Sequence, residues 1–168
     1  MIRALCLVMM MAAAAPVSAQ DDWPYAAVVH DCYDSTIRTD GATDCLGDAA
    51  NICMETEADG HTTTGMMFCL SDEAGVWDDL LNEEYAQSRA FAQRWDESDL
   101  STSPQFAVRD NQVLQAQRAW IAFRDANCTM AYGRHGAGTL RQVSGAACQM
   151  RMTAERVFEL ARYRGAKQ

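Results

Sequence analysis

The sequence lacks the local motifs of the common nucleotide-binding and hydrolytic folds. It contains no P-loop, no paired-glycine dinucleotide turn and no nucleophile elbow. The alternation of polar and apolar residues that predicts a strand never extends beyond about four residues. No internal repeat or low-complexity linker interrupts the chain. These absences favour a small all-α fold and count against most enzyme classes.

Basic residues are scarce as well. The chain has 14 lysines and arginines against 23 aspartates and glutamates, which gives a formal net charge of −9. Such a surface repels nucleic acid and anionic lipid, and it attracts basic proteins through long-range electrostatic steering. The composition therefore predicts no nucleic-acid partner and favours a basic protein as the binding partner.

Long apolar runs are missing too, and the first 19 residues hold the longest one. Arg3 precedes an apolar run from Ala4 to Ala15, and small residues follow up to Ala19. This run is too short to span a membrane and instead predicts a secretory signal peptide over 1–19, cleaved after Ala19. We therefore expect an exported protein, periplasmic or secreted, whose mature chain of about 150 residues forms one core.

Closely spaced cysteine pairs of the zinc-binding kind are also absent, because no two cysteines are separated by only two to four residues. An even number of cysteines in an exported chain predicts a disulfide framework, although six cysteines allow fifteen connectivities. We expect three disulfides, no bound metal and no cysteine nucleophile. The six cysteines that follow the signal are Cys32, Cys45, Cys53, Cys69, Cys128 and Cys148.

What the sequence does contain is helical periodicity. Apolar residues recur at steps of three, four and seven and predict long helices over 72–97, 104–131 and 144–163. Two shorter helices are predicted over 23–35 and 44–57, on either side of a turn-like TDGATD stretch. The prediction is an all-α fold, a small disulfide-stapled bundle of antiparallel helices.

Capping and breaking residues set the expected helix ends. Ser71 and Ser103 are placed as N-caps of the first two long helices, and the second helix has Pro104 at its first position. The GRHGAG stretch at 133–138 has three glycines and predicts a loop. Between these signals, we expect the aromatic residues of the 104–131 helix, Trp120 and Phe123, to fill the core.

No cluster of catalytic groups stands out. The three histidines, His30, His61 and His135, have no evident catalytic partner nearby, so we expect them to face solvent. The dense acids of the 72–97 helix are interpreted as a solvated face, and some as an alternative acidic docking surface. We therefore expect a non-enzymatic protein without a cofactor. These acids are Asp78, Asp79, Glu83 and Glu84.

Three motifs resemble those of a known family. An LNxxY element around 81–85, a QRAWxxFRDxxC element over 117–128 and a CxxxxTxxRxxEL element from Cys148 occur in order. Together they are similar to the domain of the LprI-type lysozyme inhibitors, with coverage from about residue 51 to 162. The matching positions include Asn82, Tyr85, Gln117, Arg118, Trp120, Arg124, Thr153 and Arg156.

The resemblance implies an exported helical domain over 51–164, preceded by an N-terminal extension over 20–50. It implies disulfides joining Cys128 to Cys148 and Cys53 to Cys69, which leaves Cys32 for Cys45. For the namesake branch of the family it implies inhibition of lysozyme. The alternative is a periplasmic structural or interaction module of the cell envelope without inhibitory activity.

Two interpretations of the motif arginines remain open. Arg124 and Arg156 could form a network with carboxylates such as Asp125, Glu84 or Glu155 that binds the helices together, or they could form a binding surface. We favour the structural role. The predicted partner-binding residues are then Arg134 and His135, in the glycine-rich loop, as a plug for the muramidase cleft.

Overall fold

The computed structural model describes residues 22–39 and 44–165, so the expected signal peptide over 1–19 lies outside the described residues. In this part of the chain all regular structure is helical, and no strand occurs. The all-α prediction is confirmed. The elements are α1 (Ala26–Thr39), α2 (Asp48–Thr56), α3 (Thr63–Asp99), the 3-10 turn η1 (Pro104–Phe106), α4 (Arg109–Gly133) and α5 (Leu140–Tyr163).

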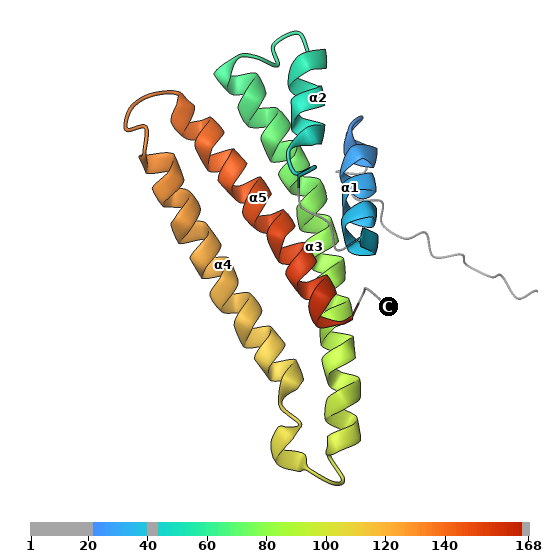
Figure 1. The fold of residues 1–168 in the computed structure, drawn as a ribbon. Helices are drawn as coiled ribbons and strands as arrows, with labels where there is room; N and C mark the ends of the chain where they lie inside the picture. Colours follow the sequence, from blue (N-terminus) through green and yellow to red (C-terminus); the bar gives the residue numbers. More distant parts are fainter. Residues whose placement is uncertain (1–21, 40–43, 166–168) are drawn as a thin grey trace, which may run out of the picture.

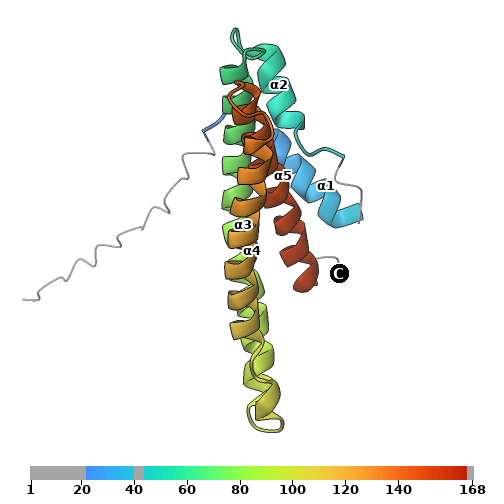
Figure 2. The same cartoon turned by 90° about the vertical axis from the view of Figure 1, so that its left-hand side faces the viewer.

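The three long helices are joined by short connections and run back and forth. α4 returns alongside α3, and α5 returns between them in the view of Figure 1. Seen from the side in Figure 2, α5, α1 and α2 all lie on the same side of the α3–α4 pair. Both views show that the far ends of α3 and α4 extend past the end of α5. We call this protruding two-helix segment, closed by η1, the arm.

The first long helix starts well before its predicted start at residue 72. Thr62 is the N-cap of α3, and its hydroxyl accepts a hydrogen bond from the backbone N–H of Gly65 at 3.0 Å. The prediction of Ser71 as N-cap is wrong, because Ser71 lies inside α3 and is exposed. The Cys53–Cys69 disulfide, with Cα atoms 5.7 Å apart, ties the early turns of α3 to α2.

The second long helix starts later than predicted, at Arg109. Residues 104–106 form only a 3-10 turn, and Ser103 makes no side-chain capping bond. The cap comes instead from α3, where the Asp96 carboxylate accepts the backbone N–H of Arg109 at 3.0 Å and that of Asp110 at 2.9 Å. A carboxylate at a helix N-terminus satisfies free N–H groups and complements the helix dipole.

The main core lies under α1, α2, α3 and α5. Trp77 is completely buried and packs edge-on against Phe158, with ring centroids 5.5 Å apart. Trp120 of α4 packs against this core while remaining partly exposed. The prediction that Phe123 fills the core is wrong, because its side chain is 62% exposed. α4 buries a narrow stripe that includes Gln117, and Phe123 lies off this stripe.

Glu73 is a buried acid that the sequence alone did not single out. Its carboxylate accepts hydrogen bonds from the backbone N–H groups of Gly47 at 2.9 Å and Ala50 at 2.7 Å, at the start of α2. The indole N–H of Trp77 donates a third bond at 3.1 Å. Three donors therefore satisfy this 1% exposed side chain, and the negative charge sits at the favourable end of the α2 dipole.

For Glu84, the prediction that the acids of this helix form a solvated face is wrong. It is 1% exposed and lies on the same buried stripe of α3 as Trp77. Its carboxylate accepts two bonds from the guanidinium of Arg164, both at 2.6 Å, and a third from the hydroxyl of Tyr33. Burial, together with the hydrogen bond to Glu84, raises the pKa of the Tyr33 hydroxyl. One carboxylate thus ties α1 and the chain after α5 to α3.

We expect Glu84→Gln to destabilise the protein, because the amide leaves the partly buried Arg164 guanidinium without its counter-charge. Breaking a buried pair costs several kcal/mol, and since the Arg164 side chain is 23% exposed a loss of roughly 2 kcal/mol is expected. Urea unfolding monitored by circular dichroism measures it. The matched control is Glu83→Gln, the exposed neighbour, which should change the free energy of unfolding very little. Equal losses in both variants would contradict the role given to Glu84.

Ion pairs join α3 to α4 at the base of the arm, where Phe91 of α3 still packs against Tyr163 of α5. Arg89 of α3 donates two bonds to the Asp110 carboxylate of α4, both at 2.6 Å. The hydrogen bond from Arg89 lowers the pKa of Asp110 below its ordinary value. Because the folded-state pKa is the lower one, this pair contributes stability above the unfolded-state pKa of about 4, and that contribution disappears as the pH falls through the folded-state pKa.

Asp110→Asn is therefore expected to lower the thermal midpoint at pH 7, while at pH 2 the gap between variant and wild type closes. The reason is that protonation removes in the wild type the charge that the variant already lacks. Melting curves at pH 7, 4 and 2 test this. Asp34→Asn is the control, since Asp34 meets Arg38 only at 3.9 Å on an exposed surface. A gap that stays constant with pH would be inconsistent with the Arg89–Asp110 pair.

Candidate functional site at the turn between α4 and α5

The predicted loop forms a compact turn between α4 and α5. Its backbone closes on itself, since the N–H of Gly136 bonds to the carbonyl of Gly133 at 3.1 Å and that of Gly138 to His135 at 2.9 Å. Gly136 has a φ of 54°, a left-handed value that side-chain-bearing residues rarely adopt. The glycines therefore shape a tight turn that ends at Leu140, where α5 begins earlier than the predicted residue 144.

The two predicted partner-binding residues of this turn have different surroundings. His135 lies 2.8 Å from the hydroxyl of Ser144, measured from Nε2 to Oγ, so its ring is attached to α5. The prediction that His135 faces solvent is corrected to this extent, because the ring is only partly exposed. Arg134 is exposed and has no ion-pair partner among the described residues. The turn thus presents one available guanidinium from an anchored backbone.

A disulfide anchors this end of the bundle. Cys128 of α4 and Cys148 of α5 are bonded, with Cα atoms 5.4 Å apart. Their sulfurs lie 3.8 Å from the thioether of Met152, which also accepts a bond from the side-chain amide of Asn127 at 3.1 Å. These buried sulfur groups form a cluster separate from the main core. A covalent bond, more than a large apolar core, therefore holds the turn in place.

The three disulfides have the pairing that the family resemblance implied. Besides Cys128–Cys148 and Cys53–Cys69, Cys32 of α1 is joined to Cys45, with Cα atoms 5.8 Å apart. Each bond joins neighbouring segments separated by 13 to 20 residues in the sequence. The pairing closes short loops in series along the chain, and a model based on unfolded-chain entropy assigns each about 3 kcal/mol.

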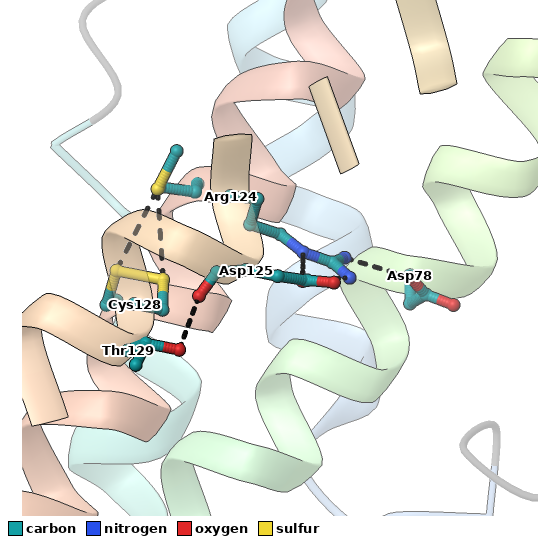
Figure 3. A network of polar contacts seen from close by, with 7 residues as sticks. Asp78, Arg124, Asp125, Cys128 and Thr129 are labelled. Carbon is teal, nitrogen blue, oxygen red and sulfur yellow. Dashed lines mark hydrogen bonds and ion pairs between the residues drawn. A yellow bond between two sulfur atoms is a disulfide. The ribbon is translucent and has the colours of Figure 1, made fainter. Parts of the chain in front are cut away.

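Two of the motif arginines, Arg124 and Arg156, connect the helices α3, α4 and α5. Trp120 is flanked by two guanidiniums, that of Arg124 at 5.0 Å and that of Arg156 at 5.8 Å from a ring centroid. Figure 3 shows Arg124 reaching both Asp125 on its own helix, at 3.0 Å, and Asp78 on α3, at 3.8 Å. The expected pairing of Arg124 with Asp125 is found.

Arg156 completes the connection on α5. Its Nε donates to the side-chain oxygen of Gln117 at 3.0 Å, and its Nη1 to Glu159 at 2.8 Å. Glu84, considered as a partner of these arginines, is instead bound by Arg164. The remaining motif residue with a free charge is Arg118, which is exposed and has no ion-pair partner in the described chain.

The other motif positions serve packing and local polar contacts. The amide of Asn82 donates to Asp78 at 3.3 Å, next to Arg124. Tyr85 lies under the guanidinium of Arg89, 6.0 Å from the ring centroid, and Thr153 is buried at 2% exposure. These contacts are of the kind expected of residues that fix the register of the bundle.

An open pocket lies beside the turn, on the α5 side of α4. Its volume is about 900 Å³, and one wall comes from Leu46, in the segment before α2. Two guanidiniums, of Arg134 and Arg151, line it together with Met130 and Met150. The sequence predicted Arg134 as a site residue but missed Arg151, which reaches the same place only because α4 and α5 are paired in this register.

Neither a candidate metal site nor a membrane-crossing helix is found in the described residues. No three His, Cys, Asp or Glu side chains come together as a metal site within residues 22–39 and 44–165. No helix in the same part of the chain is long and apolar enough to cross a membrane.

Helices cross-linked by three disulfides define this molecule as a small helical protein of the extracytoplasmic class. Residues 53–160 match the family described as lysozyme inhibitor LprI, and the chain belongs to this family. α1 lies before the matched region, yet Val29 and Cys32 are buried in the main core with α3 and α5.

Among curated proteins, the chain is similar to an uncharacterized 17.7 kDa protein in the puhA 5′ region of Rhodobacter capsulatus. The two are 26% identical over 117 residues, which cover 69% of this chain and 72% of the relative. No solved structure matches the chain. Family membership supports a lysozyme-inhibitor-like binding protein.

Removing the Cys128–Cys148 bond by a double Cys→Ser substitution is expected to cost about 3 kcal/mol of stability. It should also speed amide exchange at Gly136, Gly138 and Arg141, whose N–H groups are bonded within the turn. Hydrogen exchange followed by NMR measures both effects. The matched control is the same substitution of Cys32 and Cys45, which should destabilise the fold but leave the turn protected. Equal acceleration in both variants would show that the bond does not hold the turn.

Proposed function

We propose that the protein inhibits lysozyme by inserting the turn between α4 and α5 into the muramidase cleft. The observation that carries the proposal is the anchored turn with the exposed, unpaired guanidinium of Arg134 at its surface. Lysozyme cleaves glycan with two carboxyl groups facing across the bond. A guanidinium placed between two carboxyl groups makes charge-assisted, bidentate hydrogen bonds.

The rigidity of the turn supports this role. The Cys128–Cys148 bond and the contact of His135 with Ser144 hold the turn before any partner arrives. Preorganised loops lose less conformational entropy on binding, and they gain affinity for that reason. An inhibitor that blocks a cleft without being cleaved benefits from such a fixed shape.

The charge distribution supports approach to a basic enzyme. The formal net charge of −9 attracts a cationic protein from a distance, and salt screens this attraction. Charge steering acts mainly on the association rate, whereas the buried contacts of the turn set the dissociation rate. Exposed acids such as Glu83 on α3 contribute to this long-range field.

We expect stoichiometric inhibition of muramidase activity by the wild type, and a loss of tenfold or more in inhibition constant for Arg134→Ala with His135→Ala. An arginine anchor at an interface typically accounts for a loss of this size. Turbidity decay of a bacterial cell suspension measures the activity, and Arg118→Ala on α4 is the matched control. Absence of inhibition at micromolar protein and low salt would reject the proposal, as would equal inhibition by the double variant.

A second function, an interaction module of the cell envelope, is favoured by the tip of the arm. Trp95 and Phe106 are 51% and 59% exposed there, and Leu100 and Val108 are exposed beside them in the sequence. Exposed apolar clusters of this kind mark protein contact sites. Substituting Trp95 and Phe106 by serine should abolish capture of an envelope protein while leaving lysozyme inhibition intact, and unchanged capture would count against this function.

A further inference from the structure

We propose that the pocket between α4 and α5 binds an anionic amphiphile, a ligand with an acyl-sized apolar body and a carboxylate or phosphate head. Such a small-molecule site would be separate in function from lysozyme inhibition. Three properties of the pocket carry it, namely its apolar walls, its two unpaired arginines and the fact that its other polar groups are already engaged.

The apolar walls are large enough for an alkyl chain. The pocket of about 900 Å³ is open to solvent, and its walls include Leu46, Met130, Ala131, Ala147 and Met150. Small-molecule sites have volumes of about 300–1,000 Å³ and mostly apolar linings. Methionine side chains are flexible and polarisable, so they adapt to a ligand without a rigid shape. A flexible hydrocarbon body fits such walls better than a rigid polar ring.

Two fixed contacts join the helices that form the pocket. The Cys128–Cys148 bond fixes their spacing on one side, and the contact between His135 and Ser144 fixes it at the turn. The residues between the helices are small, including Ala131 and Ala147. The disulfide and the contact at the turn therefore limit how far α4 and α5 can move relative to each other, and the alanines in the wall leave space between the longer side chains.

Two arginines indicate that the head group of the ligand is anionic. Arg134 of the turn and Arg151 of α5 both line the pocket, and neither has an ion-pair partner among the described residues. Six other arginines of the described chain are held in ion pairs, whereas these two guanidiniums lie in the pocket wall and are available to a ligand. Guanidinium groups bind carboxylate and phosphate oxygens through parallel N–H bonds. The paired arginines are Arg38, Arg89, Arg109, Arg124, Arg156 and Arg164.

The remaining polar groups in the pocket walls already have hydrogen-bond partners, which disfavours a ligand with a polar body. The amide of Asn127 already donates to the sulfur of Met152, and the hydroxyl of Ser144 is engaged by His135. A sugar or nucleotide would need several such groups to pair its hydroxyls. A ligand with one anionic end and an otherwise apolar body would pair with the two arginines and pack against the apolar walls.

The experiment uses the mature protein labelled with ¹³C at the methionine methyl groups and titrated with sodium dodecanoate below its micelle concentration. The methyl signals of Met130 and Met150, which line the pocket, should shift and saturate. Those of Met54, Met66 and Met67, which do not line it, should remain in place. Shifts spread over all the methyl groups, or no saturation, would overturn the proposal.

Calorimetry on the same protein tests the charge. Arg151→Gln should weaken dodecanoate binding at least tenfold, whereas Arg118→Gln, on an exposed arginine outside the pocket, should leave the affinity unchanged. Arg151 is exposed, so the substitution leaves the fold intact. Equal affinity of Arg151→Gln and wild type would overturn the assignment of the head group.

Comparison of ligands separates the contributions and the sources of the ligand. Dodecanol, which has the chain without the charge, should bind at least tenfold more weakly than dodecanoate, and acetate or inorganic phosphate alone should not bind measurably. Dodecyl phosphate should bind like dodecanoate. Binding to vesicles of anionic phospholipid with no binding of free dodecanoate would overturn the proposal in favour of a membrane-surface contact, and equal binding of dodecanol would also contradict it.

Discussion

Acidic side chains on α3 that are shielded from water determine where the other helices dock. Glu73 caps the start of α2, and about three helical turns later Glu84 binds Tyr33 of α1 and Arg164 after α5. Asp96, further along, caps the start of α4. A shielded carboxylate is tolerated only when donors surround it, so each of these acids accepts a single arrangement of its neighbours. In this molecule the longest helix is the template and its acids are the attachment points.

α4 is attached differently from the other helices, and this difference places the candidate sites. Its buried positions are few, and the helix is held by the flanked ring of Trp120, by the Arg89–Asp110 pair and by the bond from Cys128 to α5. A helix held at separate points leaves surface between them. The exposed Phe123 lies between Trp120 and Cys128, and the pocket beside Arg151 extends from Cys128 toward the turn.

The sequence predicts element types well because apolar spacing is a local property of the chain. It predicts the helix ends poorly, because the decisive groups are distant or compete with nearby alternatives. Ser103 has the right chemistry for a cap, yet Asp96 on another helix caps α4. Glu84 looks like any surface acid until Arg164 is placed next to it. The disulfide pairing followed from family resemblance, since fifteen pairings are equal by counting alone.

At the candidate site, the sequence indicates the residues of the turn but not those contributed by a neighbouring helix. Glycines predict a turn, so the sequence points to Arg134 and His135 as candidate residues of the site. Arg151 lies in the middle of α5, where its relation to the turn depends on how two helices pair. Contacts between side chains of two paired helices cannot be predicted from a local pattern in a single sequence.

The attachment points along α3 also fix the number of residues that must separate them on the helix. Inserting one residue between Glu73 and Glu84 would advance everything beyond it by 1.5 Å and rotate it by about 100°. Tyr33 of α1 would then face a different side chain of α3, and the elements attached to Glu73 and to Glu84 would shift relative to each other. We therefore expect changes of length to be tolerated in an exposed connection such as the one around Thr102, and not within α3.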